Sequence, residues 1–462
     1  MQIPASILCA LVVACLFFLD RDTDARVSKA LWIPTIWVLI IGSRPITSWL
    51  QMQPTGSLVE QYSEGSPVDA AFYGVLILAG LLVLNRRSRA IRSLLRENGP
   101  LLLFFLFCAL SILWSDHPFV ALKRWIKATG DLVMVLVVLS DSRPDAAVKR
   151  LLSRVAFILL PMSVLFILFY PKLGSSYNPA DRITMYFGVT TFKNMLGMTC
   201  LICGLGSLWS LIGAFESTTM QYKTRHMMAN GAVLVMAVWL IVTADSMTSL
   251  ACLLLGAAIM VICAQRWVEE RPDHLHAIVG STVGIAFFAV FIQTAGTLLH
   301  ILGRNTTLTG RIAIWKAVLS LHTNPLIGTG FESFWLGNRL ESIWVLNEKG
   351  IQEAHNGYIE VYLNLGWAGV ILLMVLFFTG YRHLFEIYRR HPHAGLLKVS
   401  FFAVCAMYSM TEAGFRMMSI IWFAFLLAIA GVPELPRMRS KQLSNALPLT
   451  EVAKHGAMRI LR

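Results

Sequence analysis

Charged residues are scarce in this sequence. Only 14% of its 462 residues are Asp, Glu, Lys or Arg, whereas 56% are hydrophobic and the mean hydropathy is +0.65. A chain of this composition is neither a soluble enzyme nor a disordered protein, because it cannot remain solvated. Its apolar residues extend over the whole length, which excludes a protein held by a single anchor. The class that remains is a polytopic α-helical membrane protein.

The sequence also lacks the common signatures of metal, nucleotide and redox sites. It contains no HExxH, no GxxxxGK[ST], no Asp-x-Asp pair in an external loop and no glycine-rich cofactor turn. All eight cysteines lie in apolar runs. Cys200 and Cys203 have the spacing of a redox or zinc pair, but no second pair accompanies them. We therefore predict no metal, no cofactor and no disulfide framework.

About thirteen runs of mostly apolar residues recur along the chain, each long enough for a helix across about 30 Å of hydrocarbon. They centre on residues 3–19, 30–43, 69–84, 100–114, 125–140, 151–170, 192–215, 230–244, 247–264, 277–301, 358–380, 396–412 and 416–432. The first run has no basic residue before it, which predicts an uncleaved span with an external N-terminus. The predicted fold is an all-α polytopic membrane protein with 12–13 transmembrane helices, in which residues 1–432 form one integral membrane domain.

The basic residues follow the predicted connections. When these are numbered alternately from an external N-terminus, 26 of the 39 Lys and Arg fall on one face, including a cluster from Arg86 to Arg96. Such an excess marks the cytoplasmic face, so the net charge of +13 reports topology and not a nucleic-acid partner. The basic segment 433–462 is then a cytoplasmic tail that contacts anionic membrane lipids.

The longest hydrophilic stretch, residues 303–357, falls on the opposite, external face. Loops of this length are uncommon unless they have a function. Thr309 is a suitable N-cap for a short amphipathic helix over 310–322, which Asn324-Pro325 would end. We expect this loop to carry short helices and the catalytic residues.

Two arginines stand near the start of that expected helix. Arg304 and Arg311 are permanently charged, and their forked donors match phosphate oxygens at a helix N-terminus. They predict an anion site. The alternative is that both side chains reach lipid headgroups or pair with Glu332 or Glu341.

A second external basic group contains Arg182 and Lys193. Arg182 lies beside Asp181, so a local ion pair is the alternative to ligand binding. Lys193 is expected at a helix start, where a cation faces the positive end of the dipole and needs an anion nearby. A bound phosphate would supply that anion.

His355 lies near the end of the long loop. A neutral imidazole can accept a proton from a hydroxyl near pH 7; the alternative is a helix-capping or interfacial histidine. Glu360 follows at the membrane edge, where an ionisable residue is a functional candidate. Arginines for phosphate and a histidine for a hydroxyl, without a metal, predict glycosyl transfer from a lipid-linked sugar diphosphate.

Six short words in the sequence match a known superfamily. They are Gly42-Ser-Arg44-Pro-Ile-Thr-Ser-Trp49-Leu, Trp114-Ser-Asp-His-Pro with Lys123-Arg124, Phe192-Lys193-Asn194-x-x-Gly197, Gly310-Arg311-x-x-x-Trp315, Pro325-x-x-Gly328-x-Gly330 and Ala354-His355-Asn356-Gly357-Tyr358. Through them the sequence resembles the O-antigen ligase and O-antigen polymerase superfamily, most of all its exopolysaccharide-production (Wzy-type) polymerases. The resemblance covers about residues 42 to 369, and its last three words are the most specific.

This resemblance implies a metal-independent, inverting glycosyltransferase with a GT-C-like fold. It implies action at the periplasmic face of the bacterial inner membrane on an undecaprenyl-diphosphate-linked glycan. It also implies that His355 and Arg311 are catalytic, while other residues bind the diphosphate or support the site. The diphosphate-binding set is Arg182, Lys193, Arg304, Arg44 and Arg124, and the supporting set is Asn356, Glu360 and Trp315.

The activity that we predict is polymerisation of exopolysaccharide or O-antigen repeat units, with a chain-length co-polymerase as a partner. The same donor chemistry would serve a ligase that transfers polymer to the lipid A core. A lipid-linked glycan flippase is the alternative of another class, although the sequence shows no internal repeat. Cell-wall glycosyltransferases of the SEDS class typically depend on an external Asp, and we expect no external acidic residue beside the arginines.

Overall fold

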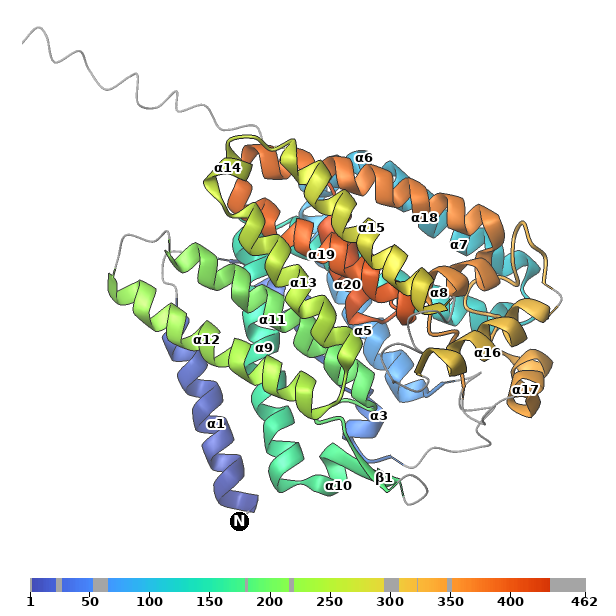
Figure 1. Cartoon of the computed structure of the whole chain (residues 1–462), viewed down its shortest axis with the longest axis horizontal. Helices are drawn as coiled ribbons and strands as arrows, with labels where there is room; N and C mark the ends of the chain where they lie inside the picture. Colours follow the sequence, from blue (N-terminus) through green and yellow to red (C-terminus); the bar gives the residue numbers. More distant parts are fainter. Residues whose placement is uncertain are drawn as a thin grey trace, which may run out of the picture. The chain divides into compact units, whose positions relative to one another are not determined.

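A computed structural model describes residues 2–21, 27–52, 65–178, 182–215, 220–294, 307–321, 323–346 and 351–432 (Figure 1). The N-terminal helices are α1 (Gln2–Leu19), η1 (Lys29–Leu31), α2 (Trp32–Ile41), α3 (Ile46–Trp49), α5 (Pro67–Arg86), α6 (Ser88–Glu97), α7 (Gly99–Leu110), η2 (Ser111–Trp114), α8 (Pro118–Leu139), α9 (Pro144–Phe169) and α10 (Pro171–Gly174). The strands β1 (Ser175–Asn178) and β2 (Ile183–Tyr186) form one antiparallel hairpin. The later helices are α11 (Lys193–Phe215), α12 (Met220–Thr243), α13 (Met247–Cys263), α14 (Arg266–Glu269), α15 (His274–Thr294), α16 (Thr307–Ser320), α17 (Gly337–Leu346), α18 (Gly357–Arg390), α19 (Pro392–Thr411) and α20 (Ile420–Ile429).

The apolar runs of the sequence are helical. Among the described residues, seven helices are long and apolar enough to cross a membrane, or eight if α6, α7 and η2 together form one bent span. Three shorter apolar helical segments, Lys29–Ile41, Met247–Cys263 and Ile420–Ile429, add to these. The predicted all-α polytopic membrane fold is confirmed, while the expected count of 12–13 crossings stays a prediction.

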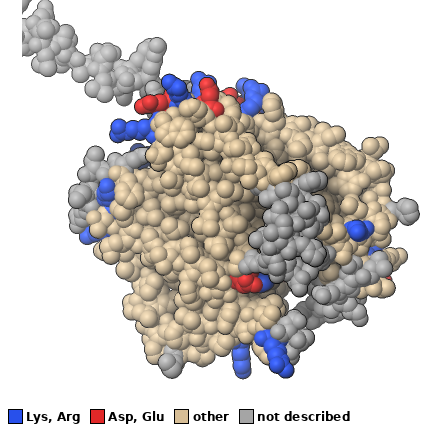
Figure 2. Space-filling model, in the orientation of Figure 1, with Lys and Arg blue, Asp and Glu red and all other residues tan. Residues whose placement is uncertain are grey.

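Much of the surface is apolar. Large hydrophobic side chains are exposed along α1, α5, α12 and α18, among them Ile3 (75%), Leu82 (66%), Val235 (70%) and Phe378 (66%). Figure 2 shows a broad uncharged area across the face in view, with Lys, Arg, Asp and Glu gathered mostly at its margins. A surface of this kind is matched by lipid tails and not by water.

Polar contacts divide the connections between the helices into two sets. Contacts within the first set are Ser28 N to Asp141 (3.2 Å), Arg87 to Asp141 (3.4 Å), His226 to Asp20 (2.5 Å) and Asn98 to Gly431 O (2.9 Å). Contacts within the second are Arg44 to Val189 O (2.8 Å), Arg339 to Asp116 (2.6 Å) and Lys193 to Asp245 (3.4 Å). These are the two sets that alternate numbering of the spans predicts.

The segment 307–357 has a small core of its own. Ile314 and Val318 of α16 pack with Phe334, Trp335 and further buried residues from α17 and α18. α16 spans 307–320 and not the predicted 310–322, so Thr309 lies within the helix and is not its N-cap. Asn324 forms the expected turn, because its side-chain oxygen accepts from the backbone N–H groups of Leu326 and Ile327.

α18 is broken at Gly366, where φ is 63° and ψ is −165°. The segment from Pro325 to Gly330 docks at this break through backbone hydrogen bonds. Thr329 N donates to Leu363 O (3.2 Å), and Trp367 N donates to Pro325 O (2.9 Å). The Pro325-x-x-Gly328-x-Gly330 word thus has a structural role, because it attaches the segment before it to α18 near Gly366.

Candidate functional site

His355 lies in a turn with an unusual backbone. Its φ is 49°, in the left-handed region that non-glycine residues seldom adopt. Asn356 then caps α18, since its Oδ1 accepts from Tyr358 N and Ile359 N, both at 3.0 Å. Its Nδ2 donates to Met410 O at 2.9 Å. The turn that presents His355 is therefore fixed by the helix start that follows it.

Ala354, which precedes His355, forms hydrogen bonds through both its carbonyl oxygen and its N–H group. Trp315 Nε1 donates to the carbonyl oxygen of Ala354 at 2.7 Å. The buried carboxylate of Glu360 accepts from Ala354 N and from Trp335 Nε1, the latter at 2.9 Å. Trp315 and Glu360 therefore support the His355 turn by direct hydrogen bonds.

Arg311 lies one turn before Trp315 on α16, so both side chains lie on the same face of the helix. While Trp315 holds the His355 turn, Arg311 Nη2 donates to Glu412 Oε1 at 2.6 Å. The spacing of the Gly310-Arg311-x-x-x-Trp315 word thus brings a cation beside the histidine. Among the ion pairs between described residues, Arg311 has none with Glu332 or Glu341, the two carboxylate partners that the sequence offered as alternatives.

Glu412 joins the two predicted catalytic residues. It follows α19, its side chain is only 6% exposed, and its carboxylate contacts Arg311, His355 Nδ1 (3.2 Å) and Asn194 Nδ2 (3.2 Å). The expectation that no external acidic residue lies beside the arginines is therefore wrong. The sequence separates Glu412 from Arg311 by about a hundred residues, and only the fold brings them together.

Charges of alternating sign continue beyond His355. Glu353 Oε1 lies 2.9 Å from His355 Nδ1, and Glu353 Oε2 lies 3.7 Å from Arg416 Nη1. Arg416 also pairs with the buried Glu332 at 3.3 Å, and Arg124 donates to the carbonyl oxygen of Glu332. Arg124 thus contacts the backbone of Glu332, next to the ion pair between Arg416 and Glu332. The whole chain of charges joins α8, α16, the turn before α18 and the connection from α19 to α20.

These carboxylates alter the acid–base behaviour of His355. Burial on its own lowers the pKa of the imidazole, but hydrogen bonds and charge from Glu353 and Glu412 outweigh this and raise the pKa to about 9. Both carboxylates contact Nδ1. None of the polar contacts between described residues involves Nε2, and the side chain is 29% exposed, so Nε2 can meet a substrate.

Glu353, His355 and Glu412 could in principle hold a metal ion, since their ligand atoms lie within 4.8 Å of one another. Arg311 and Arg416 already pair with these two carboxylates. A divalent cation would have to displace or repel both guanidinium groups. The donor set suits a charge-compensated histidine better than a metal, and we assign none to it.

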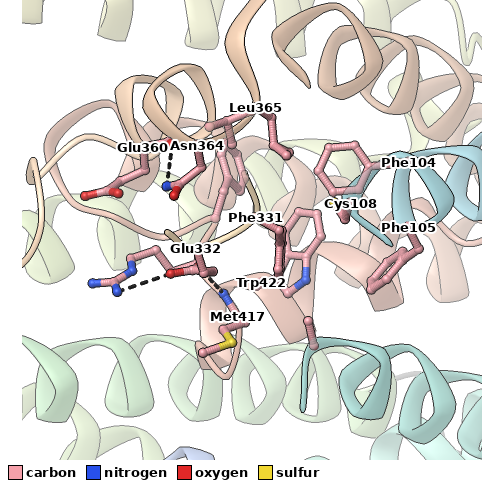
Figure 3. Close-up of a pocket in the computed structure, with 14 residues that line it drawn as sticks. Phe104, Phe105, Cys108, Phe331, Glu332, Glu360, Asn364, Leu365, Met417 and Trp422 are labelled. Carbon is pink, nitrogen blue, oxygen red and sulfur yellow. Dashed lines mark hydrogen bonds and ion pairs between the residues drawn. The ribbon is translucent and has the colours of Figure 1, made fainter. Parts of the chain in front are cut away.

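A small cavity lies beside the ion pair between Arg416 and Glu332 (Figure 3). Glu332, Glu360 and Asn364 stand at one end, and Phe104, Phe105 and Trp422 at the other. Its volume is about 30 Å³. That is room for one or two water molecules and not for a sugar or an isoprenoid chain. This cavity therefore does not serve as a substrate site.

Arg44 has a structural task that the sequence does not predict. Its guanidinium donates to the carbonyl oxygens of Leu173, Gly188, Val189 and Thr190 at 2.8–3.0 Å and lies 5.3 Å from the ring centroid of Trp49. These contacts hold the segment that contains the hairpin against α3. Nε and Nη2 are occupied in this way, so the Ser-Arg-Pro word has a structural role, and the part of Arg44 in binding a diphosphate stays a prediction.

The other predicted basic residues are spread out. Lys193 begins α11 and pairs with the exposed Asp245 at 3.4 Å, which supplies the anion that its position requires. Arg182 is exposed at the turn of the hairpin, where its φ is 53°. No polar contact between described residues joins either one to His355. Arg304 lies outside the described residues, as does the predicted tail 433–462.

Sequence reasoning missed four members of the site, which are Glu412, Arg416, Glu353 and Asn194. A signal was present for the first two. Glu412 ends one apolar run, and Arg416 begins the next after three residues. Ionisable residues at such a junction are functional candidates on the same grounds as Glu360.

Comparison with known proteins adds to this geometry. Residues 231–374 match the family model described as O-antigen ligase. Exopolysaccharide production protein ExoQ of Rhizobium meliloti (strain 1021) is 25% identical over 290 residues, which cover 60% of this chain and 63% of the relative. The resemblance to the O-antigen ligase and polymerase superfamily is confirmed. The match thus spans less than two thirds of that relative. The O-antigen ligase match contains Arg311, Trp315 and His355, but it ends before Glu412.

Proposed function

We propose that this protein is a glycosyltransferase of the bacterial inner membrane that joins saccharide units from an undecaprenyl-diphosphate-linked donor at the periplasmic face. The observation that carries the proposal is the meeting of Arg311 and His355 at Glu412. An anion-binding cation and a proton acceptor are then available side by side, next to an apolar helical body. The similarity to the O-antigen ligase family and to ExoQ supports a glycan substrate.

The proposed reaction is an inverting displacement. An acceptor sugar hydroxyl attacks C1 of the donor sugar, the bond from C1 to the diphosphate oxygen breaks, and the hydroxyl proton passes to His355 Nε2. Arg311 has five donors and uses Nη2 for Glu412, so others are left for the diphosphate. Its charge stabilises the leaving lipid diphosphate, a task that a divalent cation performs in other enzymes.

We favour polymerisation of repeat units over ligation to lipid A core. The relative ExoQ is named for exopolysaccharide production, which supports polymerisation, whereas the matched family is described as O-antigen ligase. Both reactions use the same donor chemistry and differ in the acceptor. The lipid-linked glycan that accumulates in a deletion strain distinguishes them, because single repeats indicate a lost polymerase and full-length polymer a lost ligase.

The direct test is an assay with the purified full-length protein in vesicles that contain the lipid-linked repeat unit. We expect longer glycan chains and free lipid diphosphate, with undiminished yield in EDTA. Movement of the donor across the bilayer without bond formation would instead indicate a flippase and overturn the proposal.

Variants of the two central residues sharpen this assay. His355→Ala is expected to reduce the rate about 10²–10⁴-fold and Arg311→Ala about 10²–10³-fold, the ranges for loss of a general base and of a transition-state donor. Lys316→Ala, which removes an exposed cation from the same helix as Arg311, is the matched control and should retain full activity. Near-normal polymer from either central variant would remove that residue from the mechanism.

A further inference from the structure

Glu412 is a convergence point of three separate segments. Its buried carboxylate accepts from Arg311 of α16, from Asn194 of α11 and from His355 Nδ1. Its backbone carbonyl accepts from Gly357 N, the first residue of α18, at 3.0 Å. The side chain and the backbone carbonyl of Glu412 therefore both hold the turn in which His355 precedes α18.

The contact to His355 is directional. Because a carboxylate only accepts, it favours the imidazole form that carries a proton on Nδ1. The lone pair of the neutral ring is then on Nε2, which faces away from the carboxylates. A carboxylate that accepts from Nδ1 therefore fixes both the tautomer and the orientation of a functional histidine.

Glu353 and Glu412 differ in what they connect. Both reach His355 Nδ1, but the other side-chain ion pair of Glu353 is with Arg416, at 3.7 Å. Glu412 pairs with Arg311 at 2.6 Å and is more deeply buried than Glu353, at 6% against 28% exposed. Glu412 is thus the carboxylate that couples the histidine to the cation proposed for the diphosphate.

We propose that Glu412 is a positioning residue of the transfer reaction, which holds His355 with Nδ1 protonated and links it to Arg311. When a diphosphate draws Arg311 toward itself, the charge of Glu412 is left to stabilise the imidazolium that forms at His355. Glu353 and Glu412 are the titratable groups that contact His355 directly, and Arg311 and Arg416 pair with these two carboxylates. This inference rests on the proposed function, since it assigns a role within that reaction.

The test is the pH dependence of polymer formation by Glu412→Gln in the vesicle assay. The substitution keeps the shape and removes the charge. We expect the plateau rate near pH 9 to fall at least about 10-fold and the acidic limb of the pH–rate profile to move to lower pH, because one of the two carboxylates that hold the imidazolium is lost. Glu341→Gln, which removes an exposed charge from α17, should leave rate and profile unchanged.

A second variant guards against a fold defect. Glu412→Asp retains the charge with a shorter reach, so it should lower the rate and leave the acidic limb near its wild-type position. If the His355-dependent wild-type activity is present but Glu412→Gln moves neither rate nor limb, Glu412 has no such role while the proposed function stands. If polymer forms equally well in His355→Ala, His355 is not the base and this inference fails, while the proposed function stands. If the wild-type protein forms no polymer, the proposed function fails, and this inference fails with it.

Discussion

The pKa of His355 determines how the rate should depend on pH. Burial lowers this pKa, but Glu353 and Glu412 raise it to about 9, so the ring is mainly protonated at pH 7 and only about 1% is the neutral base. A general base must be neutral. We therefore expect the rate of polymer formation to rise about tenfold per pH unit from pH 6 to 8 and to level near pH 9.

Measurement of initial rates in sealed vesicles across this range checks that expectation. A rate that is flat at neutral pH and falls above pH 9 would show that the active form is the imidazolium. His355 would then act as a cation toward the diphosphate, and another group would accept the proton.

Arg44 and Arg311 should respond to substitution in opposite ways. Arg44→Ala leaves four carbonyl oxygens without their donor, and bonds to a charged group contribute about 1.5–3 kcal/mol each. We expect the variant to lose at least about 2 kcal/mol of stability and to melt at a lower temperature in detergent. Arg311→Ala should melt close to the wild type while losing activity. Equal melting of Arg44→Ala and the wild type would contradict the structural role.

Individual residues of the site were predictable where a local pattern carried the signal. Arg311, Trp315 and His355 are close in two short words, and their chemistry is evident from residue type. Glu412 was not predictable in this way, because its partners Asn194 and Arg311 meet it only after distant helices have packed. The structural contacts of Arg44 were not predictable for the same reason, because the carbonyl oxygens that accept from it belong to another segment.

At the scale of elements, the break in α18 is the feature on which the site depends. Gly366 adopts a backbone conformation that is essentially restricted to glycine, and a Cβ there would lie 2.3 Å from the carbonyl carbon of Leu326. Gly366→Ala should therefore cost at least about 3 kcal/mol and separate the 325–330 segment from α18. Yield of folded protein and melting in detergent measure this effect.

Gly74→Ala is the control for that experiment. Gly74 lies within α5, where an added Cβ would meet nothing within 4 Å, and alanine favours a helix by up to about 1 kcal/mol. It should melt at or slightly above the wild-type temperature. A Gly366→Ala protein as stable as Gly74→Ala would show that the break tolerates a side chain.

The sequence predicted the presence of the helices better than the residues at which they begin and end. The apolar runs became helices because a segment in hydrocarbon must satisfy its backbone polar groups internally. The start of α16 was placed too late, at Thr309, because capping preference is weak beside the packing of Ile314 and Val318 on α17 and α18. Nor does any local pattern predict the break at Gly366, since it depends on the docking of the distant 325–330 segment.

For the whole molecule, the distribution of basic residues predicted which connections lie together. The rule acts on loops as they are inserted, so it can be read from sequence without any knowledge of packing. The polar contacts reproduce the two sets, with Asp141 near Arg87 in one and Arg339 near Asp116 in the other. Which set faces the periplasm is part of the proposed function, and it can be measured.

Labelling of single cysteines tests that orientation. In a background with Cys9 and Cys15 replaced by Ala, Glu341→Cys on α17 and Arg89→Cys on α6 each place a thiol at an exposed position. A maleimide that cannot cross membranes should label Glu341→Cys in intact cells with a permeabilised outer membrane, and Arg89→Cys only after lysis. Because His355 and Arg311 share the segment of α17, the reverse pattern would put the site in the cytoplasm. Labelling of both thiols in intact cells would show that the two sets of connections do not lie on opposite faces.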